Sequence, residues 1–232
     1  MQKIVIPIEN PLITAAYKVN AYTNRFGYIH YGIDIADYKL NKNIYSPGDG
    51  IIYDCGMDGK SYKDKRGNCI VMILKDVQFP TGEIKNLSAR LFHLDNILVS
   101  KGQHVKQGDI IGVYGNSGAN TTGAHLHIEF DTDINYPAYA VGIKNSGNII
   151  KKGSVDSTLD PSSIWFKKEN QIIKTNEKIG TWVLENDINI PVLPNINYKE
   201  KYESVMKEKE ILKNNVQNLY NMVESMGKDD SK

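Results

Sequence analysis

The sequence has very little cysteine: Cys55 and Cys69 are the only two among 232 residues. Two cysteines are too few for a disulfide scaffold or for a zinc clip with four cysteine ligands. We expect both to be small core residues on neighbouring strands. The sequence alone leaves open whether they form a disulfide.

Long hydrophobic runs are also lacking, and none approaches the ~20 residues that span a bilayer. Only a short apolar stretch follows Met1-Gln2-Lys3 before Glu9 and Asn10, so we expect no secretory signal. The sequence therefore predicts a soluble protein without membrane insertion. Such a protein acts inside the cell or leaves it by a route other than standard export.

Neither sign of charge is in excess: the sequence has 28 Lys and Arg residues and 27 Asp and Glu residues, which gives a formal net charge of +1. A balanced chain has no basic footprint for nucleic acid or for an anionic membrane surface. The hydrophobic fraction of 41% is ordinary for a globular protein and excludes wholesale disorder. The length suits one or two domains.

The first 165 residues are typical of a mainly β domain. Short apolar or β-branched segments alternate with glycine-containing turns, and no stretch has the length and period of a helix. This pattern predicts an antiparallel sheet or sandwich. The predicted strands cover 44–53, 68–75, 89–94, 109–114 and 126–130.

The rest of the chain has a different pattern. Residues 166–197 are predicted to form a connector or small extension. From 198 to 226, apolar residues recur at alternating steps of three and four, interrupted at Lys209, which predicts an amphipathic helix before a polar tail at 227–232. Two interpretations are open: a helix lying on its own domain, or a short coiled coil that pairs two chains or docks on a partner.

Two of the five histidines lie in one short strand, His125-Leu126-His127. Side chains two residues apart on a strand point to the same face, so both imidazoles share one side. Two such imidazoles can bind one metal ion, or one can bind while the other transfers protons. A pair of exposed strand histidines has the same pattern, so the pair alone decides nothing.

The other histidines differ in their surroundings. His30 precedes Asp34 by four residues, and zinc accepts both imidazole nitrogen and carboxylate oxygen, but whether they converge depends on the fold. Asp37 is an alternative carboxylate. A lone histidine between apolar neighbours, such as His93, is more often a satisfied core group, and His104 in a polar turn is expected to be solvated.

Several segments follow one another along the chain: Asn24-Arg25-Phe26-Gly27, His30-x-x-x-Asp34, Ser46-Pro47-Gly48-Asp49-Gly50, Gly67-Asn68-Cys69-Ile70-Val71, Phe92-His93-Leu94, 105–112, Gly115-Asn116-Ser117-Gly118, 122–130 and Leu159-Asp160-Pro161. Together they resemble peptidase family M23, the LytM- and lysostaphin-like zinc enzymes that cut peptidoglycan. The resemblance runs from about residue 24 to residue 130 in the family's order. Phe92 replaces the usual Tyr and Ala124 a common Pro, but neither change removes a chemical group from the inferred site.

This resemblance implies one Zn²⁺ per chain, bound by His30, Asp34 and His127. It implies that His93 and His125 are the catalytic pair that does not bind the metal. Three protein ligands leave the fourth zinc position open, as catalytic sites do. The implied function is a zinc metalloendopeptidase that hydrolyses peptide cross-links of bacterial peptidoglycan. The alternative is a non-catalytic LytM-like binding or activator module in a larger assembly.

Further expectations concern the surroundings of this site. Glu129 shares the face of His125 and His127, so it either orients a metal ligand or is a solvated strand residue. Because the histidines must be neutral to act, we expect activity to fall below about pH 6. A peptide groove is expected to be lined by Asn116, Ser117, Asn120 and Thr121.

The expected lack of an export signal bears on where such an enzyme acts. A cell-wall hydrolase without that signal is consistent with a phage endolysin that is released by lysis or with a phage virion component. Both would act at the bacterial cell wall. A host enzyme whose signal lies outside this sequence has the same pattern.

Overall fold

The computed structural model describes residues 1–56, 66–139, 156–175, 189–190, 207 and 213. The chain divides into two compact units, Met1–Pro191 and Val192–Lys232. Lys207 and Lys213 have helical backbone, but the rest of the helix predicted at 198–226 lies outside the described residues. Within the described part, no helix has the length and apolar character needed to cross a membrane.

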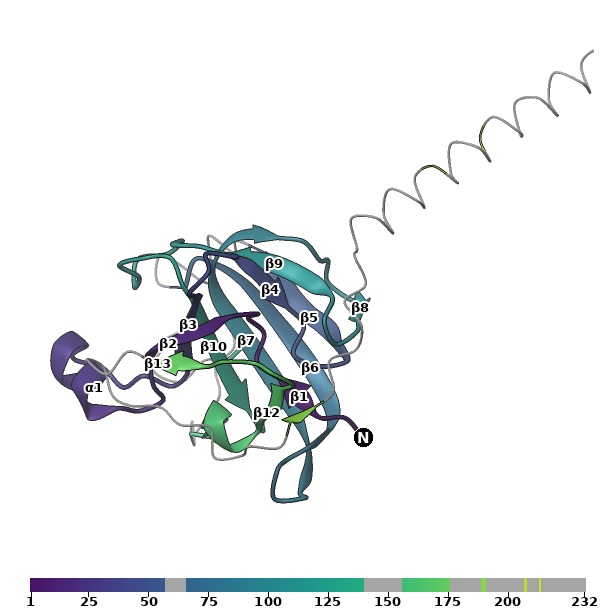
Figure 1. Ribbon diagram of the computed structural model, residues 1–232, viewed down its shortest axis with the longest axis horizontal. Helices are drawn as coiled ribbons and strands as arrows, with labels where there is room; N and C mark the ends of the chain where they lie inside the picture. Colours follow the sequence, from purple (N-terminus) through teal and green to yellow (C-terminus); the bar gives the residue numbers. More distant parts are fainter. Residues whose placement is uncertain (57–65, 140–155, 176–188, 191–206, 208–212, 214–232) are drawn as a thin grey trace, which may run out of the picture. The chain divides into compact units, whose positions relative to one another are not determined.

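Strands dominate the first unit, and one large sheet holds most of them (Figure 1). In chain order the elements are β1 (Ile4–Val5), β2 (Pro11–Ala15), α1 (Asn20–Phe26), β3 (Ile33–Asp37), β4 (Asn43–Tyr45), β5 (Gly50–Gly56), β6 (Asn68–Gln78), β7 (Ile84–Ile97), β8 (His104–Val105), β9 (Ile110–Tyr114), β10 (Leu126–Asp131), β11 (Thr158–Leu159), the 3-10 helix η2 (Pro161–Ser163), β12 (Trp165–Lys168), β13 (Lys174–Thr175) and β14 (Asn189–Ile190).

The large sheet has the order β13-β2-β3-β10-β7-β6-β5-β8, with β11 on β10 and with β9 on both β4 and β7. Its pairs are antiparallel except for β13 with β2, and β1 and β14 run parallel to β12 in a second, three-stranded sheet. The predicted mainly β, largely antiparallel fold is therefore confirmed. Strand β10 lies between β3 and β7, the position that brings the candidate site together.

Two local predictions differ from the structure. The strand predicted over 44–53 is split into β4 and β5, because Pro47 has no backbone N–H and Ser46 Oγ donates to the carbonyl of Gly48 across a tight turn. Helix α1, only seven residues long, was not predicted, because two turns are too short for a clear helical period.

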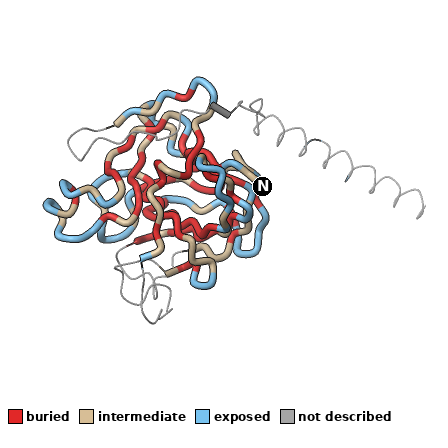
Figure 2. The backbone as a smooth tube through the Cα atoms, turned by 90° about the horizontal axis from the view of Figure 1, so that it is seen from below, coloured by how far each residue is buried: buried red, intermediate tan, exposed pale blue. Residues whose placement is uncertain are grey.

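The central strands are buried on both faces (Figure 2). One face of β10 packs apolar side chains against the core, where Phe130 meets the Trp165 ring edge-on at 5.8 Å between centroids. The other face of the same strand carries polar groups, including His127 and Glu129, which are also buried. Burying polar groups is costly unless they are hydrogen-bonded, so this face must have specific partners.

Cys55 and Cys69 do not form a disulfide with each other. In the register of β5 and β6, Cys55 lies opposite Ile70, the neighbour of Cys69. Since successive side chains on a strand alternate between the faces, Cys55 and Cys69 point to opposite sides of the sheet. Both are small packing residues, as the sequence predicts.

Candidate metal centre

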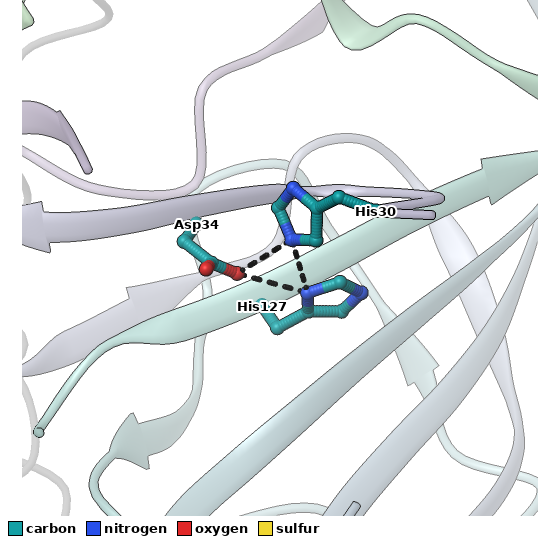
Figure 3. A group of neighbouring side chains, drawn as sticks. All are labelled: His30, Asp34 and His127. Atoms are coloured by element: carbon teal, nitrogen blue, oxygen red, sulfur yellow. Dashed lines mark hydrogen bonds and ion pairs between the residues drawn. The ribbon is translucent and has the colours of Figure 1, made fainter. Parts of the chain in front are cut away.

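Three side chains of the polar face converge on one point (Figure 3). Asp34 on β3 lies directly opposite His127 on β10, and residues opposite each other on paired strands share a face. Asp34 Oδ1 lies 2.8 Å from His127 Nδ1 and 3.1 Å from His30 Nε2, and the two nitrogens are 3.0 Å apart. The structure thus brings together the three residues predicted to bind metal.

His30 reaches this point from the loop before β3 rather than from a helix. Its Nδ1 lies 2.8 Å from the carbonyl oxygen of Ala16. A carbonyl only accepts hydrogen bonds, so Nδ1 carries the proton and Nε2 of the neutral ring presents its lone pair to Asp34 and His127. The ring of Tyr22, on α1, stacks on the His30 ring with the two ring centroids 4.1 Å apart. This packing helps to fix the orientation of the His30 ring.

His127 has the opposite tautomer. Its Nε2 lies 3.2 Å from Glu129 Oε1, and a carboxylate accepts, so Nε2 carries a proton and Nδ1 holds the lone pair whenever the ring is neutral. Two lone pairs and a carboxylate oxygen therefore meet within about 3 Å, an arrangement that repels itself unless a cation lies between them. Imidazole nitrogen and carboxylate oxygen are ligands that suit zinc, so the residues fit the metal that the resemblance implies.

Electrostatics around this point favour a cation. The pKa of Asp34 is held well below its usual value, because the histidine charges and hydrogen bonds outweigh burial. Burial by itself would lower the pKa of His127, but hydrogen bonds to Asp34 and Glu129 raise it to about 9. A proton on His127 and a metal ion therefore compete for the same position.

His93 and His125 lie beside the three converging residues. His93 lies at a bulge of β7 with φ at +67°, a left-handed backbone conformation that turns its ring into the site. Its Nδ1 is 2.9 Å from the carbonyl oxygen of Ser117, and His125 Nδ1 is 2.7 Å from that of Gly123. In both neutral rings the carbonyl leaves Nε2 as the unprotonated nitrogen.

The pair is close enough to act on one substrate group. The ring centroids of His93 and His125 are 5.0 Å apart, and His125 Nε2 lies 3.6 Å from Asp34 Oδ1. Burial, with the charges of His127 and His125, lowers the pKa of His93 to about 4. His93 is therefore neutral at ordinary pH and able to accept a proton.

Glu129 and Arg90 form a buried ion pair behind His127. Glu129 Oε2 accepts from Arg90 Nε at 2.8 Å, so the alternative of a solvated strand residue is wrong for Glu129. Although burial opposes it, the Arg90 charge and the contacts with His127 lower the pKa of Glu129 to about 2. Arg90 was not singled out from the sequence. An arginine inside an apolar strand pattern was the available signal.

The remaining candidates have other roles. Asp37 accepts hydrogen bonds from Asn10 and Lys39 and is not part of the converging group, so it is not the alternative ligand. His104 is exposed on β8. Among the residues expected to line a groove, Ser117 holds His93 through its carbonyl, and Thr121 Oγ1 donates to Asn116 Oδ1 at 2.6 Å.

The family model described as Peptidase family M23 matches residues 28–138 of this chain. All five candidate site residues lie inside this range, whereas Tyr22 and the whole of α1 precede it. No curated protein sequence matches the chain.

Solved structures similar to this chain include two peptidases and LytU. A zinc-containing peptidase from Vibrio cholerae is 28% identical with a TM-score of 0.43, over 56% of this chain and 36% of that one. The catalytic domain of lysostaphin from Staphylococcus simulans is 23% identical, with a TM-score of 0.39, over 63% and 84%. LytU is 26% identical, with a TM-score of 0.42, over 65% and 81%. This chain thus covers little more than a third of the Vibrio structure.

Proposed function

The chain carries a domain of peptidase family M23 at residues 28–138, and from this premise we propose that it is a zinc metalloendopeptidase acting on peptidoglycan. Members of this family are peptidoglycan hydrolases, and the bond we propose is a peptide cross-link of the bacterial cell wall. The observation that carries the proposal is the group of three metal-ligand atoms beside two histidines whose Nε2 atoms are unprotonated.

In this proposal His30 binds the metal through Nε2, His127 through Nδ1 and Asp34 through Oδ1. When bound, zinc supplies Lewis acidity, which makes a water molecule more acidic and polarises the scissile carbonyl. Ala16 and Glu129 keep the protons on the outer nitrogens of the two histidines, so that both lone pairs stay directed at the metal.

His93 and His125 carry the proton transfers. Each accepts a proton at Nε2, because its Nδ1–H is bound to a backbone carbonyl. Once protonated, the same Nε2–H donates a hydrogen bond to the oxyanion that develops on the substrate carbonyl, and then returns a proton to the leaving amine.

The direct test is turbidity loss of purified peptidoglycan sacculi, with and without a chelator, with products identified by mass spectrometry. We expect chelator-sensitive release of peptides that have new amine ends, and the masses name the bond. Bound zinc without cleavage of sacculi of several cross-link types would contradict the proposal. It would favour the non-catalytic binding or activator module instead.

Two finer parts of the proposal concern the setting. Delivery as a phage product stays a prediction. Pairing or docking through 198–226 also stays a prediction, since that segment lies outside the described residues apart from Lys207 and Lys213. Cleavage of isolated sacculi does not depend on either.

A further inference from the structure

Behind the candidate metal centre, Arg90 joins two carboxylates in the interior of the sheet. The pairing of β7 with β10 places Arg90 directly opposite Glu129. Arg90 has no exposed surface, and its Nε donates to Glu129 Oε2 at 2.8 Å while Nη2 donates to Asp131 Oδ2 at 3.0 Å. Its Nη1 lies 3.3 Å from the carbonyl oxygen of Pro137. Each of its three nitrogens thus donates to an acceptor.

Glu129 stands between this guanidinium and a proposed metal ligand. Its Oε2 accepts from Arg90, and its Oε1 accepts from His127 Nε2 at 3.2 Å. Glu129 is 4% exposed, so water does not compete for either oxygen. Because both neighbours donate, both atoms at the end of side chain 129 must be acceptors, a condition that a carboxylate meets and an amide does not.

The Arg90–Glu129 pair affects metal binding through the tautomer of His127. With Glu129 held by Arg90, the proton that neutral His127 retains is the one on Nε2, so Nδ1 is the nitrogen that loses its proton and directs its lone pair at Asp34 and His30. An acceptor lost at Oε1 would favour the other tautomer, with a proton on Nδ1 where the metal binds. Burial in a region of low dielectric strengthens this coupling.

We propose that Arg90 is a positioning residue that acts through the Glu129 carboxylate to hold His127 in its metal-binding tautomer. The inference rests on the proposed function, since it assumes that His127 binds zinc. It adds the requirement that position 129 be a carboxylate and that position 90 provide an N–H facing it.

The test compares zinc affinity, measured by competition with a chromogenic chelator, in the full-length protein and its variants. Glu129→Gln keeps the size of the side chain but places an NH₂ group against either Arg90 or His127. We expect zinc to bind about 10- to 100-fold more weakly. Wild-type affinity in Glu129→Gln would overturn the proposal.

Asp131→Asn is the matched control. It also replaces a carboxylate on Arg90 by an amide, but among the described residues the other hydrogen-bond partners of the Asp131 carboxylate are Ser157 and Asp133, not His127. We expect a lower unfolding temperature of the metal-free protein in both variants and weaker zinc binding only in Glu129→Gln. Equal losses of affinity in the two variants would show a general structural effect and overturn the proposal.

Arg90→Lys keeps the charge but loses the planar fork that spans both carboxylates. It serves as the second arm if Glu129→Gln does not fold, and we expect its zinc affinity to lie between wild type and Glu129→Gln. Unchanged affinity in Arg90→Lys would remove Arg90 from the proposal. Failure of the wild-type protein to bind zinc would instead contradict the proposed function, so the two failures are distinguishable.

Discussion

His93 and His125 differ in burial although the same kind of contact orients both. His93 is 5% exposed, whereas the side chain of His125 is 16% exposed. Because burial penalises the charged ring, the pKa of His93 is lowered to about 4. We therefore expect a loss of activity near pH 6 to come from protonation of groups other than His93.

Substitution of single site residues should separate metal binding from catalysis. His30→Ala or Asp34→Ala removes a proposed metal ligand, so we expect loss of bound zinc by elemental analysis. His93→Ala or His125→Ala should retain zinc and lose at least about 100-fold in turnover of sacculi, the usual contribution of a general acid or base. Wild-type turnover by His125→Ala would show that its assigned role is wrong.

Zinc binding should release a proton. The contacts with Asp34 and Glu129 raise the pKa of His127 to about 9, so at pH 7 the metal-free protein holds a proton there that zinc must displace. We therefore expect zinc affinity to rise with pH up to about 9. Calorimetry at pH 7 in buffers of different ionisation enthalpy should give about one proton released per zinc ion. No release would contradict protonation of His127.

At the scale of elements, the site depends on how closely the start of β3 approaches β10. Gly32 precedes β3, and a Cβ atom there would lie 2.5 Å from the carbonyl oxygen of Ile128 and 2.7 Å from His127 Nε2. Backbone atoms cannot move aside as a flexible side chain can. The absence of a side chain at position 32 therefore lets Asp34 lie opposite His127.

Gly32→Ala should accordingly separate these two strands. We expect a loss of about 1–3 kcal/mol in the free energy of unfolding, as for other overpacked sites, and weaker zinc binding. Urea unfolding and chelator competition measure the two effects. Gly123→Ala is the control, because a Cβ atom there meets nothing within 4 Å. Equal behaviour of the two variants would contradict the close approach.

At the scale of the first unit, residues beyond the M23 match complete the core. Strand β12 pairs with β1, and Trp165 is buried against Phe130 of the strand that carries His127. The core under the site is therefore built in part by residues after 138. A chain ending there would leave Phe130 without its aromatic neighbour.

Trp165→Ala should test this contribution. Removing a fully buried large aromatic side chain typically costs about 3–5 kcal/mol, so we expect a clear fall in the thermal unfolding temperature. Leu40→Ala, at a residue that is 85% exposed, is the control and should change little. An unchanged unfolding temperature in Trp165→Ala would show that the Trp165 side chain does not stabilise the core under the site.

The prediction for 198–226 belongs to the whole molecule. If this segment pairs two chains, light scattering after size exclusion should give a dimer or larger species for the full chain and a monomer for residues 1–196. A monomer in both samples would contradict pairing of chains. Of the predicted roles of 198–226 in association, only docking on a different protein would then remain.

Local sequence periodicity determined what depends on neighbours along the chain. The shared face of His125 and His127 follows from the period of two, and the strands at 68–75, 89–94, 109–114 and 126–130 follow from β-branched runs between glycine turns. These strands are lengthened or trimmed in the structure but are all present. The resemblance added the identity of the five site residues.

Only the tertiary structure decided what depends on strand register and on contacts distant in sequence. It placed Asp34 opposite His127, brought His30 to both from a loop, and paired Arg90 with Glu129 across 39 residues. It also assigned the protons of the histidines, because the carbonyl and carboxylate partners come from other segments. No local pattern encodes such pairings, since register is set by packing of the whole sheet.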